Sequence, residues 1–353
     1  VLRNWCNAYQ MHADQQAKQG DFREAVRTLE RVVRLDPSNP APLVQMGSYL
    51  LRLDHVQEAI FRLEEAVELK PGEIDAHELL GEAYYRDNDL PSARAQWDYV
   101  IEMDPKRNSL RERYEKAFRE ESVESDFNRA GSRHFRISYP KGMPTQLRAR
   151  VLTILERAYL DIGRKMGAVY PPGPIQVIVY DAEQFSQATQ LEANVGAVYD
   201  GKIRVPLTTQ EGELLDDEEL KRRLTHEYVH VVVRHLVGDK VPWWVNEGLA
   251  ETFSGMIEPG RADLLRRIYA QDAAFGLAEL EAHQLRILDT EALRLAYAQS
   301  HATMDLLWSR FGQRRLEQFL GELAAGTSPE EALRRTYRRN YANLEAEVAV
   351  LFQ

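Results

Sequence analysis

Two histidines, His226 and His230, stand four residues apart in the segment His226-Glu227-Tyr228-Val229-His230. On an α-helix, residues four apart lie one turn above each other on the same face, so both imidazoles can reach one metal ion. Glu227 would then lie beside the metal, close enough to take a proton from a bound water molecule. The pattern is therefore typical of a metal site that activates water.

The conformation of this segment decides whether that chemistry is possible. Its valines, including those at positions 231–233, are β-branched and would also suit a strand. In a strand the two histidines would still share a face, but Glu227 would point to the opposite side. Residues 215–224 are strongly helical in composition, and we therefore predict a helix that continues through the motif.

Two histidines do not complete such a site, because a catalytic zinc ion usually has three protein ligands and one open position. A candidate third ligand lies downstream, in the segment Trp243-Trp244-Val245-Asn246-Glu247-Gly248-Leu249-Ala250-Glu251. We expect Glu247 to complete the site from a second helix. Glu251, one turn later, could accept the outer N–H of a ligating histidine and fix its tautomer.

These residues resemble the gluzincin metallopeptidases, the clan that includes thermolysin and aminopeptidase N. The segment Asn246-Glu247-Gly248-Leu249-Ala250 is similar to the glutamate-ligand segment of the aminopeptidase N type. The resemblance is greatest to peptidase-MA-like domains, which in bacteria often accompany tetratricopeptide repeats, and it spans roughly residues 133–312. Sixteen residues separate His230 from Glu247, slightly fewer than in better-known members, so we expect a cleft of different shape.

The resemblance implies a zinc-dependent peptidase with His226, His230 and Glu247 as the Zn²⁺ ligands. Glu227 would act as the general base, taking a proton from the zinc-activated water and later passing it to the leaving amine. The alternative interpretation of the same residues is a scaffold protein whose metallohydrolase-like domain binds zinc but is catalytically silent.

A further donor is needed for the developing oxyanion. The candidate is Tyr297, because a similar tyrosine-containing helix follows the metal helices in related families. The opposing interpretation, a tyrosine that merely packs on an amphipathic helix, is equally well supported by the sequence. His301, one turn later, is a weaker candidate.

The substrate class rests on two further observations. The hairpin predicted at 196–206 precedes the metal helix, and an exposed edge there could bind an extended peptide or protein substrate by strand addition, or could be purely structural. No Gly-Ala-Met-Glu-Asn-like segment, which an aminopeptidase would need to hold a free amine, precedes the metal helix. An endopeptidase is therefore slightly favoured over an aminopeptidase.

The part of the sequence before the metal-site domain contains a repeat with a period of 34 residues, which is marked by Pro37, Pro71 and Pro105. Small and large residues recur in register with the prolines. The aligned sets are Ala13, Gly47 and Gly81; Ala25, Ala59 and Ala93; and Leu29, Leu63 and Trp97. Small residues suit close helix crossings, and the pattern over residues 3–105 resembles the tetratricopeptide repeat.

The repeats predict the domain organisation. We expect an all-α solenoid of three repeats with a capping helix in residues 1–122, the cap lying at 106–122 with Leu110, Tyr114 and Phe118 on its packing face. A linker is expected at 123–132 and the zinc metallopeptidase-like domain at 133–353. Because strands come first and helices follow in that domain, its fold class is α+β. The resemblance to gluzincins implies a thermolysin-like zincin with a small sheet and active-site helices.

The repeats also suggest a protein partner or a substrate-presenting surface. The positions expected to face the groove are Asn7, Gln10, Asp14, Val44, Ser48, Arg52, Asp75, Glu78, Glu82, Tyr85 and Arg86. The paired Lys and Asn residues that clamp a C-terminal carboxylate in chaperone-binding repeats are missing, which argues against that ligand. A spacer or a lid on the peptidase domain is the alternative.

Composition excludes several other classes. The chain has 45 basic and 55 acidic residues and a formal charge of −10, so it lacks the positive surface of a nucleic-acid binder. Its single cysteine, Cys6, excludes an internal disulfide framework and a thiolate zinc cage. No apolar run has bilayer-spanning length. The sequence begins at Val1 without a signal-peptide pattern, so any targeting segment would lie outside it; we expect a bacterial periplasm or cell envelope, with the cytoplasm as the alternative.

Overall fold

The computed structural model describes residues 2–191, 197–238, 241–257, 259–271, 273–281 and 290–353. The chain divides into two compact units. Unit 1 is Val1–Arg129, Ser138–Lys141 and Ile178–Ala193; unit 2 is Ala130–Ile137, Gly142–Val177 and Asn194–Gln353. The domain boundaries expected from sequence, at 122 and 132, stay a prediction.

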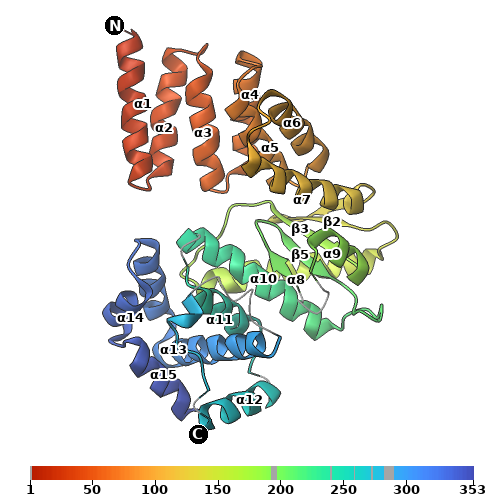
Figure 1. Ribbon diagram of the computed structural model, residues 1–353, viewed down its shortest axis with the longest axis vertical. Helices are drawn as coiled ribbons and strands as arrows, with labels where there is room; N and C mark the ends of the chain where they lie inside the picture. The colour runs from red at the N-terminus through yellow and green to blue at the C-terminus, as the bar shows by residue number, and fades with distance from the viewer. Residues whose placement is uncertain (1, 192–196, 239–240, 258, 272, 282–289) are drawn as a thin grey trace. The chain divides into compact units, whose positions relative to one another are not determined.

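Unit 1 begins with helices that pack against one another in sequence order, as Figure 1 shows. They are α1 (Leu2–Lys18), α2 (Phe22–Leu35), α3 (Pro40–Arg52), α4 (Val56–Leu69), α5 (Ile74–Arg86) and α6 (Leu90–Met103). Asp21, Asn39 and Asp89 each cap the helix that follows them, because their side chains accept a backbone N–H of its first turn. The predicted helical repeats are therefore present.

The small residues of the repeat lie where helices cross closely. A Cβ atom added at Gly47 would come within 2.4 Å of the Leu63 side chain, and one added at Gly81 within 2.3 Å of the Trp97 indole. Both distances are far below van der Waals contact, so only glycine fits there. The 34-residue register predicted that these small residues lie at close helix crossings, and the structure confirms this for both glycines and adds the large residue that each one meets.

The capping helix α7 (Asn108–Glu124) follows the last repeat and also packs against α9 (Ala182–Thr189). Leu110 and Ala117 are buried on its inner face. Phe118, which the four-residue spacing placed on that face, is 51% exposed, so this expectation was wrong. The helix presents Ala117 inward, one residue earlier in its turn, and Phe118 contacts the guanidinium of Arg94.

The strands form one five-stranded sheet in the order β1-β2-β3-β5-β4. They are β1 (Asn128–Gly131), β2 (Phe135–Tyr139), β3 (Ile175–Tyr180), β4 (Val198–Tyr199) and β5 (Ile203–Pro206). The hairpin predicted from sequence in this region is formed by β4 and β5, with Val198 opposite Arg204 and Tyr199 opposite Ile203. The segment expected to be a linker contains β1.

Two long helices of unit 2, α8 (Thr145–Lys165) and α10 (Asp217–Val237), pack against each other. Aromatic rings join them to β2: the ring centroids of Phe135 and Tyr228 lie 5.6 Å apart, and those of Tyr159 and Tyr228 lie 5.9 Å apart. Tyr228 belongs to the His-Glu-x-x-His segment, so these contacts determine how that segment of α10 is oriented.

The rest of unit 2 is helical. It comprises α11 (Trp243–Ser254), α12 (Pro259–Ala270), the short 3₁₀ helix η3 (Glu279–Glu281), α13 (Thr290–Ala324), α14 (Pro329–Tyr337) and α15 (Tyr341–Val350). Gly312 lies inside α13, where it has φ +68° and interrupts the helical backbone. The order of strands followed by helices agrees with the predicted α+β class.

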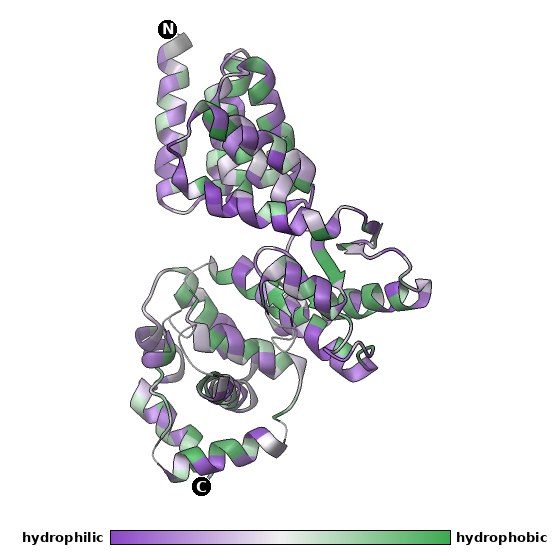
Figure 2. Cartoon of the chain, turned by 45° about the vertical axis from the view of Figure 1, so that its right-hand side comes forward, coloured by the Kyte–Doolittle hydropathy of each residue, from purple (hydrophilic) through white to green (hydrophobic). Residues whose placement is uncertain are grey.

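Hydrophilic residues occur along all the long helices, as the colouring of Figure 2 makes visible. Among the described residues, no helix is both long enough and apolar enough to cross a membrane.

Candidate metal centre

The helix α10 carries His226, Glu227 and His230. It begins at an N-cap, Asp216, whose side chain accepts the backbone N–H of Glu219 at 2.8 Å, and it ends at Gly238 with φ +75°. The predicted helical conformation of the motif is confirmed, and the strand alternative is excluded. His226 and His230 therefore share one face, with ring centroids 4.8 Å apart.

The next helix, α11, brings Glu247 to the two imidazoles. Its Oε2 atom lies 3.4 Å from Nε2 of His226 and 3.5 Å from Nε2 of His230. One ligand atom from each of the three residues lies within 4.8 Å of the others. The position of α11 depends on Gly248, where an added Cβ would come within 2.4 Å of the Ser300 backbone oxygen on α13.

The donor set and its spacing fit zinc. Tetrahedral zinc with ligand bonds of about 2.1 Å separates neighbouring ligand atoms by about 3.4 Å. The two Nε2–Oε2 distances, 3.4 and 3.5 Å, agree with that edge length. Two imidazoles and one carboxylate also form the nitrogen–oxygen ligand set common to catalytic zinc sites. Glu247 and His230 are each 8% exposed, so the cluster is largely shielded from water.

The charges within the cluster support a cation at its centre. Burial alone would raise the pKa of Glu247, but the two imidazoles hold it far below its usual value. Burial alone would lower the pKa of His230, but the carboxylate of Glu247 raises it to about 9. Without a metal, His230 therefore keeps a proton at neutral pH, and its positive charge compensates the carboxylate of Glu247. A bound cation would compensate the same carboxylate.

Glu227 lies on α10 between the two histidines and is 4% exposed. Burial raises its pKa, while the imidazoles of His230 and His226 oppose that rise. Its Oε2 atom is buried and has no hydrogen-bond partner among the described residues. A carboxylate with a raised pKa and an unused oxygen is suited to accept a proton and to release it again.

Tyr297, on α13, interacts electrostatically with the carboxylates of the same cluster. The carboxylate of Glu247, followed by burial and the carboxylates of Glu227 and Glu251, raises the pKa of Tyr297, so its hydroxyl keeps its proton at neutral pH. Its ring also packs edge-on against Trp243 at 5.0 Å. Tyr297 is therefore under the electrostatic influence of the cluster and also has a packing contact with Trp243, so both interpretations of this residue stay compatible with the structure.

Glu251, one turn after Glu247, lies behind His226, with its Oε1 atom 3.6 Å from Nδ1 of that ring. Arg261 of α12, which no sequence pattern singled out, donates a hydrogen bond to Oε2 of Glu251. Burial would raise the pKa of Glu251, but His226 and Arg261 hold it below its usual value. His301 lies nearby, with Nδ1 3.9 Å from the same carboxylate, rather than among the ligands.

The hairpin of unit 2 contains an ion pair whose arginine is buried. Arg204 of β5 is fully buried and lies 3.4 Å from both carboxylate oxygens of Asp200 in the turn. Asp200 contributes to the raised pKa of Glu227. The two edge strands of the sheet are β1 and β4, and β5 lies between β3 and β4. Ile203 therefore belongs to an inner strand, and among the described residues the hairpin edge expected for strand addition is formed by Val198 and Tyr199 of β4.

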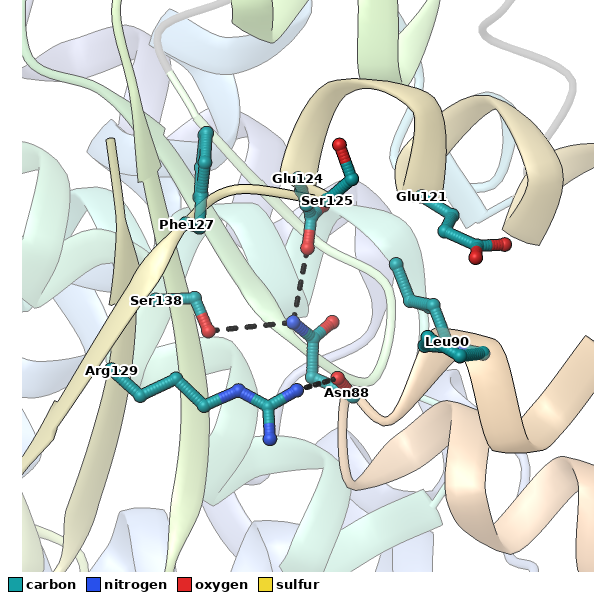
Figure 3. A pocket seen from close by; sticks show the side chains of 9 residues that line it. Asn88, Leu90, Glu121, Glu124, Ser125, Phe127, Arg129 and Ser138 are labelled. Atoms are coloured by element: carbon teal, nitrogen blue, oxygen red, sulfur yellow. Dashed lines mark hydrogen bonds between the residues drawn. The ribbon is translucent and has the colours of Figure 1, made fainter. Parts of the chain in front are cut away.

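Unit 1 contains a cavity of about 400 Å³, and none of its lining residues belongs to the metal cluster. In Figure 3 the Nδ2 atom of Asn88 donates to Glu124 at 3.0 Å and to Ser138 at 3.4 Å, while Arg129 donates to the backbone oxygen of Asn88. Tyr180 donates to the other oxygen of Glu124 at 2.5 Å. These polar groups satisfy one another and explain how the end of α7 is held.

The predicted groove residues of the third repeat are engaged in ion pairs with the region after it. Arg107 lies 2.6 Å from Asp75 and also pairs with Glu78. Arg113 lies 2.5 Å from Glu78 and 3.4 Å from Glu82. The sequence indicated the acidic residues but not the two arginines that neutralise them.

Helical repeats and a domain with His-Glu-x-x-His on one helix and a glutamate on the next define a tetratricopeptide-repeat protein with a gluzincin-like domain. The family model of the Peptidase MA superfamily matches residues 162–351, more than half of the sequence, and the chain belongs to this superfamily. Tetratricopeptide-repeat models match residues 7–39 and 44–108. The predicted resemblance to both families is confirmed.

Solved structures similar to part of the chain include the first tetratricopeptide domain of Spaghetti (RPAP3) bound to the HSP90 peptide SRMEEVD. It is 22% identical, covers 33% of this chain and 91% of that one, and has a TM-score of 0.32. The first tetratricopeptide domain of the human RPAP3 protein is also 22% identical, covers 32% and 90%, and has the same TM-score. A comparison with curated proteins finds no match.

Proposed function

We propose that this chain is a zinc-dependent peptidase in which His226, His230 and Glu247 bind Zn²⁺ and Glu227 is the general base. The observation that carries the proposal is geometric: Oε2 of Glu247 lies 3.4 Å from Nε2 of His226 and 3.5 Å from Nε2 of His230. Membership of the Peptidase MA superfamily supports it independently. The buried, unpaired oxygen of Glu227 on the same helix supports activity rather than metal binding alone.

Zn²⁺ bound by these three residues would supply the Lewis acidity that makes water a nucleophile at neutral pH. In the proposed reaction Glu227 accepts one proton from the attacking water and delivers it to the leaving amine nitrogen as the peptide bond breaks. Tyr297, which keeps its proton at neutral pH, donates a hydrogen bond to the oxygen of the attacked carbonyl. Glu251 orients the ring of His226 from behind.

Within the peptidases, we assign this chain to the endopeptidases, acting on a peptide or protein substrate. The assignment rests on the sequence before α10, which lacks the Gly-Ala-Met-Glu-Asn-like segment that an aminopeptidase would need. Tetratricopeptide repeats are protein-interaction modules. We propose that those of unit 1 dock a partner or the substrate itself.

Zinc content and peptide cleavage test the proposal directly. We expect about one zinc per chain in the wild type and in Glu227→Gln, and none in Glu247→Ala, because Glu247 is a ligand whereas Glu227 is not. Cleavage of a peptide blocked at its N-terminus should fall by about 10³-fold or more in zinc-loaded Glu227→Gln.

The outcomes separate the alternatives. Wild type that holds zinc and cleaves nothing would identify a repeat scaffold with a catalytically silent domain. Cleavage that disappears when the peptide's N-terminus is blocked would identify an aminopeptidase. Wild type that binds no zinc at neutral pH would overturn the metal site itself.

A further inference from the structure

We propose that Arg261 is a positioning residue of the metal centre, whose guanidinium holds the carboxylate of Glu251 so that one oxygen faces Nδ1 of His226. This inference rests on the proposed zinc site and adds to it a residue from a third helix, α12.

The contacts form a chain across three helices. Nη1 of Arg261 donates to Oε2 of Glu251, and Nη2 lies 3.5 Å from Oε1. A guanidinium that contacts both carboxylate oxygens restricts the rotation of the carboxylate. Oε1 lies in turn 3.6 Å from Nδ1 of His226. The orientation of one proposed ligand on α10 is thereby coupled, through α11, to a side chain on α12.

Glu251 requires a charged partner because it is 6% exposed, and an isolated buried carboxylate is costly to desolvate. His301 does not supply that charge: burial lowers its pKa, so it is neutral at neutral pH, and its Nδ1 atom lies 3.9 Å from the carboxylate. Arg261 carries a permanent charge and makes the hydrogen bond.

The ring of His226 requires the carboxylate. Its Nδ1 atom is buried and has no hydrogen-bond partner among the described residues, and the Glu251 oxygen faces it. A ligating histidine keeps its tautomer and orientation through an acceptor for its outer N–H, and loss of such support typically costs 10–100-fold in metal affinity. Loss of Arg261 should therefore weaken zinc binding although Arg261 does not touch the metal ligands.

The test is the zinc dissociation constant of the full-length chain, measured by competition with a chromophoric chelator. We expect Arg261→Ala to raise the Kd about 10-fold. The Kd of Arg261→Lys should lie between those of Arg261→Ala and wild type, because an ammonium restores the charge but cannot contact both carboxylate oxygens as a planar guanidinium does. Arg266→Ala is the matched control, since Arg266 is on the same helix, exposed and paired with Asp263, and its Kd should stay within twofold of wild type.

A double-mutant cycle shows whether Arg261 acts through Glu251. In a Glu251→Gln background, Arg261→Ala should have little further effect on the zinc Kd, because the carboxylate it positions is already gone. An Arg261→Ala effect that is equally large in both backgrounds would overturn the proposal. So would a Kd within twofold of wild type in the single variant.

The ring tautomer of His226 provides a readout that needs neither zinc nor activity. In ¹⁵N-histidine NMR spectra of the zinc-free protein, assigned with the His226→Gln variant, Arg261→Ala should move the His226 proton from Nδ1 towards Nε2, because Glu247 faces Nε2 at 3.4 Å while the Glu251 carboxylate at Nδ1 is no longer held. If wild type binds zinc but cleaves nothing, the peptidase proposal fails and both measurements still decide the role of Arg261. If wild type binds no zinc, an unchanged tautomer in Arg261→Ala overturns the role of Arg261 as well.

Discussion

Tyr297 is the residue whose role depends most on a single atom, its hydroxyl oxygen. The ring packs against Trp243 at 5.0 Å, and that contact needs no hydroxyl. The carboxylate of Glu247 is the largest cause of the raised pKa of Tyr297, which places the hydroxyl in the electrostatic field of the metal cluster. Removing the hydroxyl alone therefore separates the packing role from the catalytic one.

For Tyr297→Phe we expect kcat for peptide cleavage to fall about 100-fold with zinc content unchanged, because a donor to the developing oxyanion is lost while the ligands remain. Tyr337→Phe is the control, since the ring of Tyr337 also packs against aromatic neighbours, Phe311 and Phe319, and the residue lies outside the metal cluster. Steady-state kinetics on both variants decide the matter. Turnover like that of wild type in Tyr297→Phe would leave the residue with its packing role.

At the scale of elements, the site depends on how closely α11 approaches α13. Gly248 is next to the proposed ligand Glu247, and its missing side chain lets the helix lie against the Ser300 carbonyl and the Met304 side chain. A backbone oxygen cannot move aside as a flexible side chain can. Any side chain at position 248 must therefore push α11, and Glu247 with it, away from its place.

Gly248→Ala should lower the free energy of unfolding by about 2 kcal/mol and weaken zinc binding, because overpacking displaces the ligand helix. Gly321→Ala, on the exposed side of α13 where nothing lies within 4 Å, is the control and should be neutral or slightly stabilising. Urea unfolding of the zinc-free proteins and chelator competition measure the two effects. Equal stability of the two variants would contradict the close-approach argument.

At the scale of the whole molecule, the chain consists of two compact units, and the proposed ligands all belong to unit 2. A ligand stabilises the folded unit that binds it, by about 2.7 kcal/mol when its free concentration is 100 times Kd. The close crossings at Gly47 and Gly81, in contrast, belong to the core of unit 1.

Calorimetry should therefore show that zinc raises the unfolding temperature of one transition and leaves a second unchanged. Gly81→Ala, whose added methyl would meet the Trp97 indole at 2.3 Å, should lower the second transition and leave the zinc-dependent shift intact. A single transition that moves with both zinc and Gly81→Ala would instead show that the two units unfold as one.

The sequence by itself determined the features that follow local rules. A 34-residue register predicted which small residues lie at close helix crossings, and the four-residue spacing of His226 and His230 predicted a shared helical face, because both patterns follow from local helical geometry. The metal ligand from α11 could also be proposed from sequence, since its motif resembles a known family.

Only the tertiary structure decided which distant groups meet. Arg261 reaches Glu251, Arg107 and Arg113 neutralise the acidic groove positions, and β5 rather than β4 occupies the interior of the sheet. Phe118 is exposed because the exact rotation of α7 depends on what it packs against. These outcomes arise from long side chains and packing between elements far apart in the chain, which no local periodicity encodes.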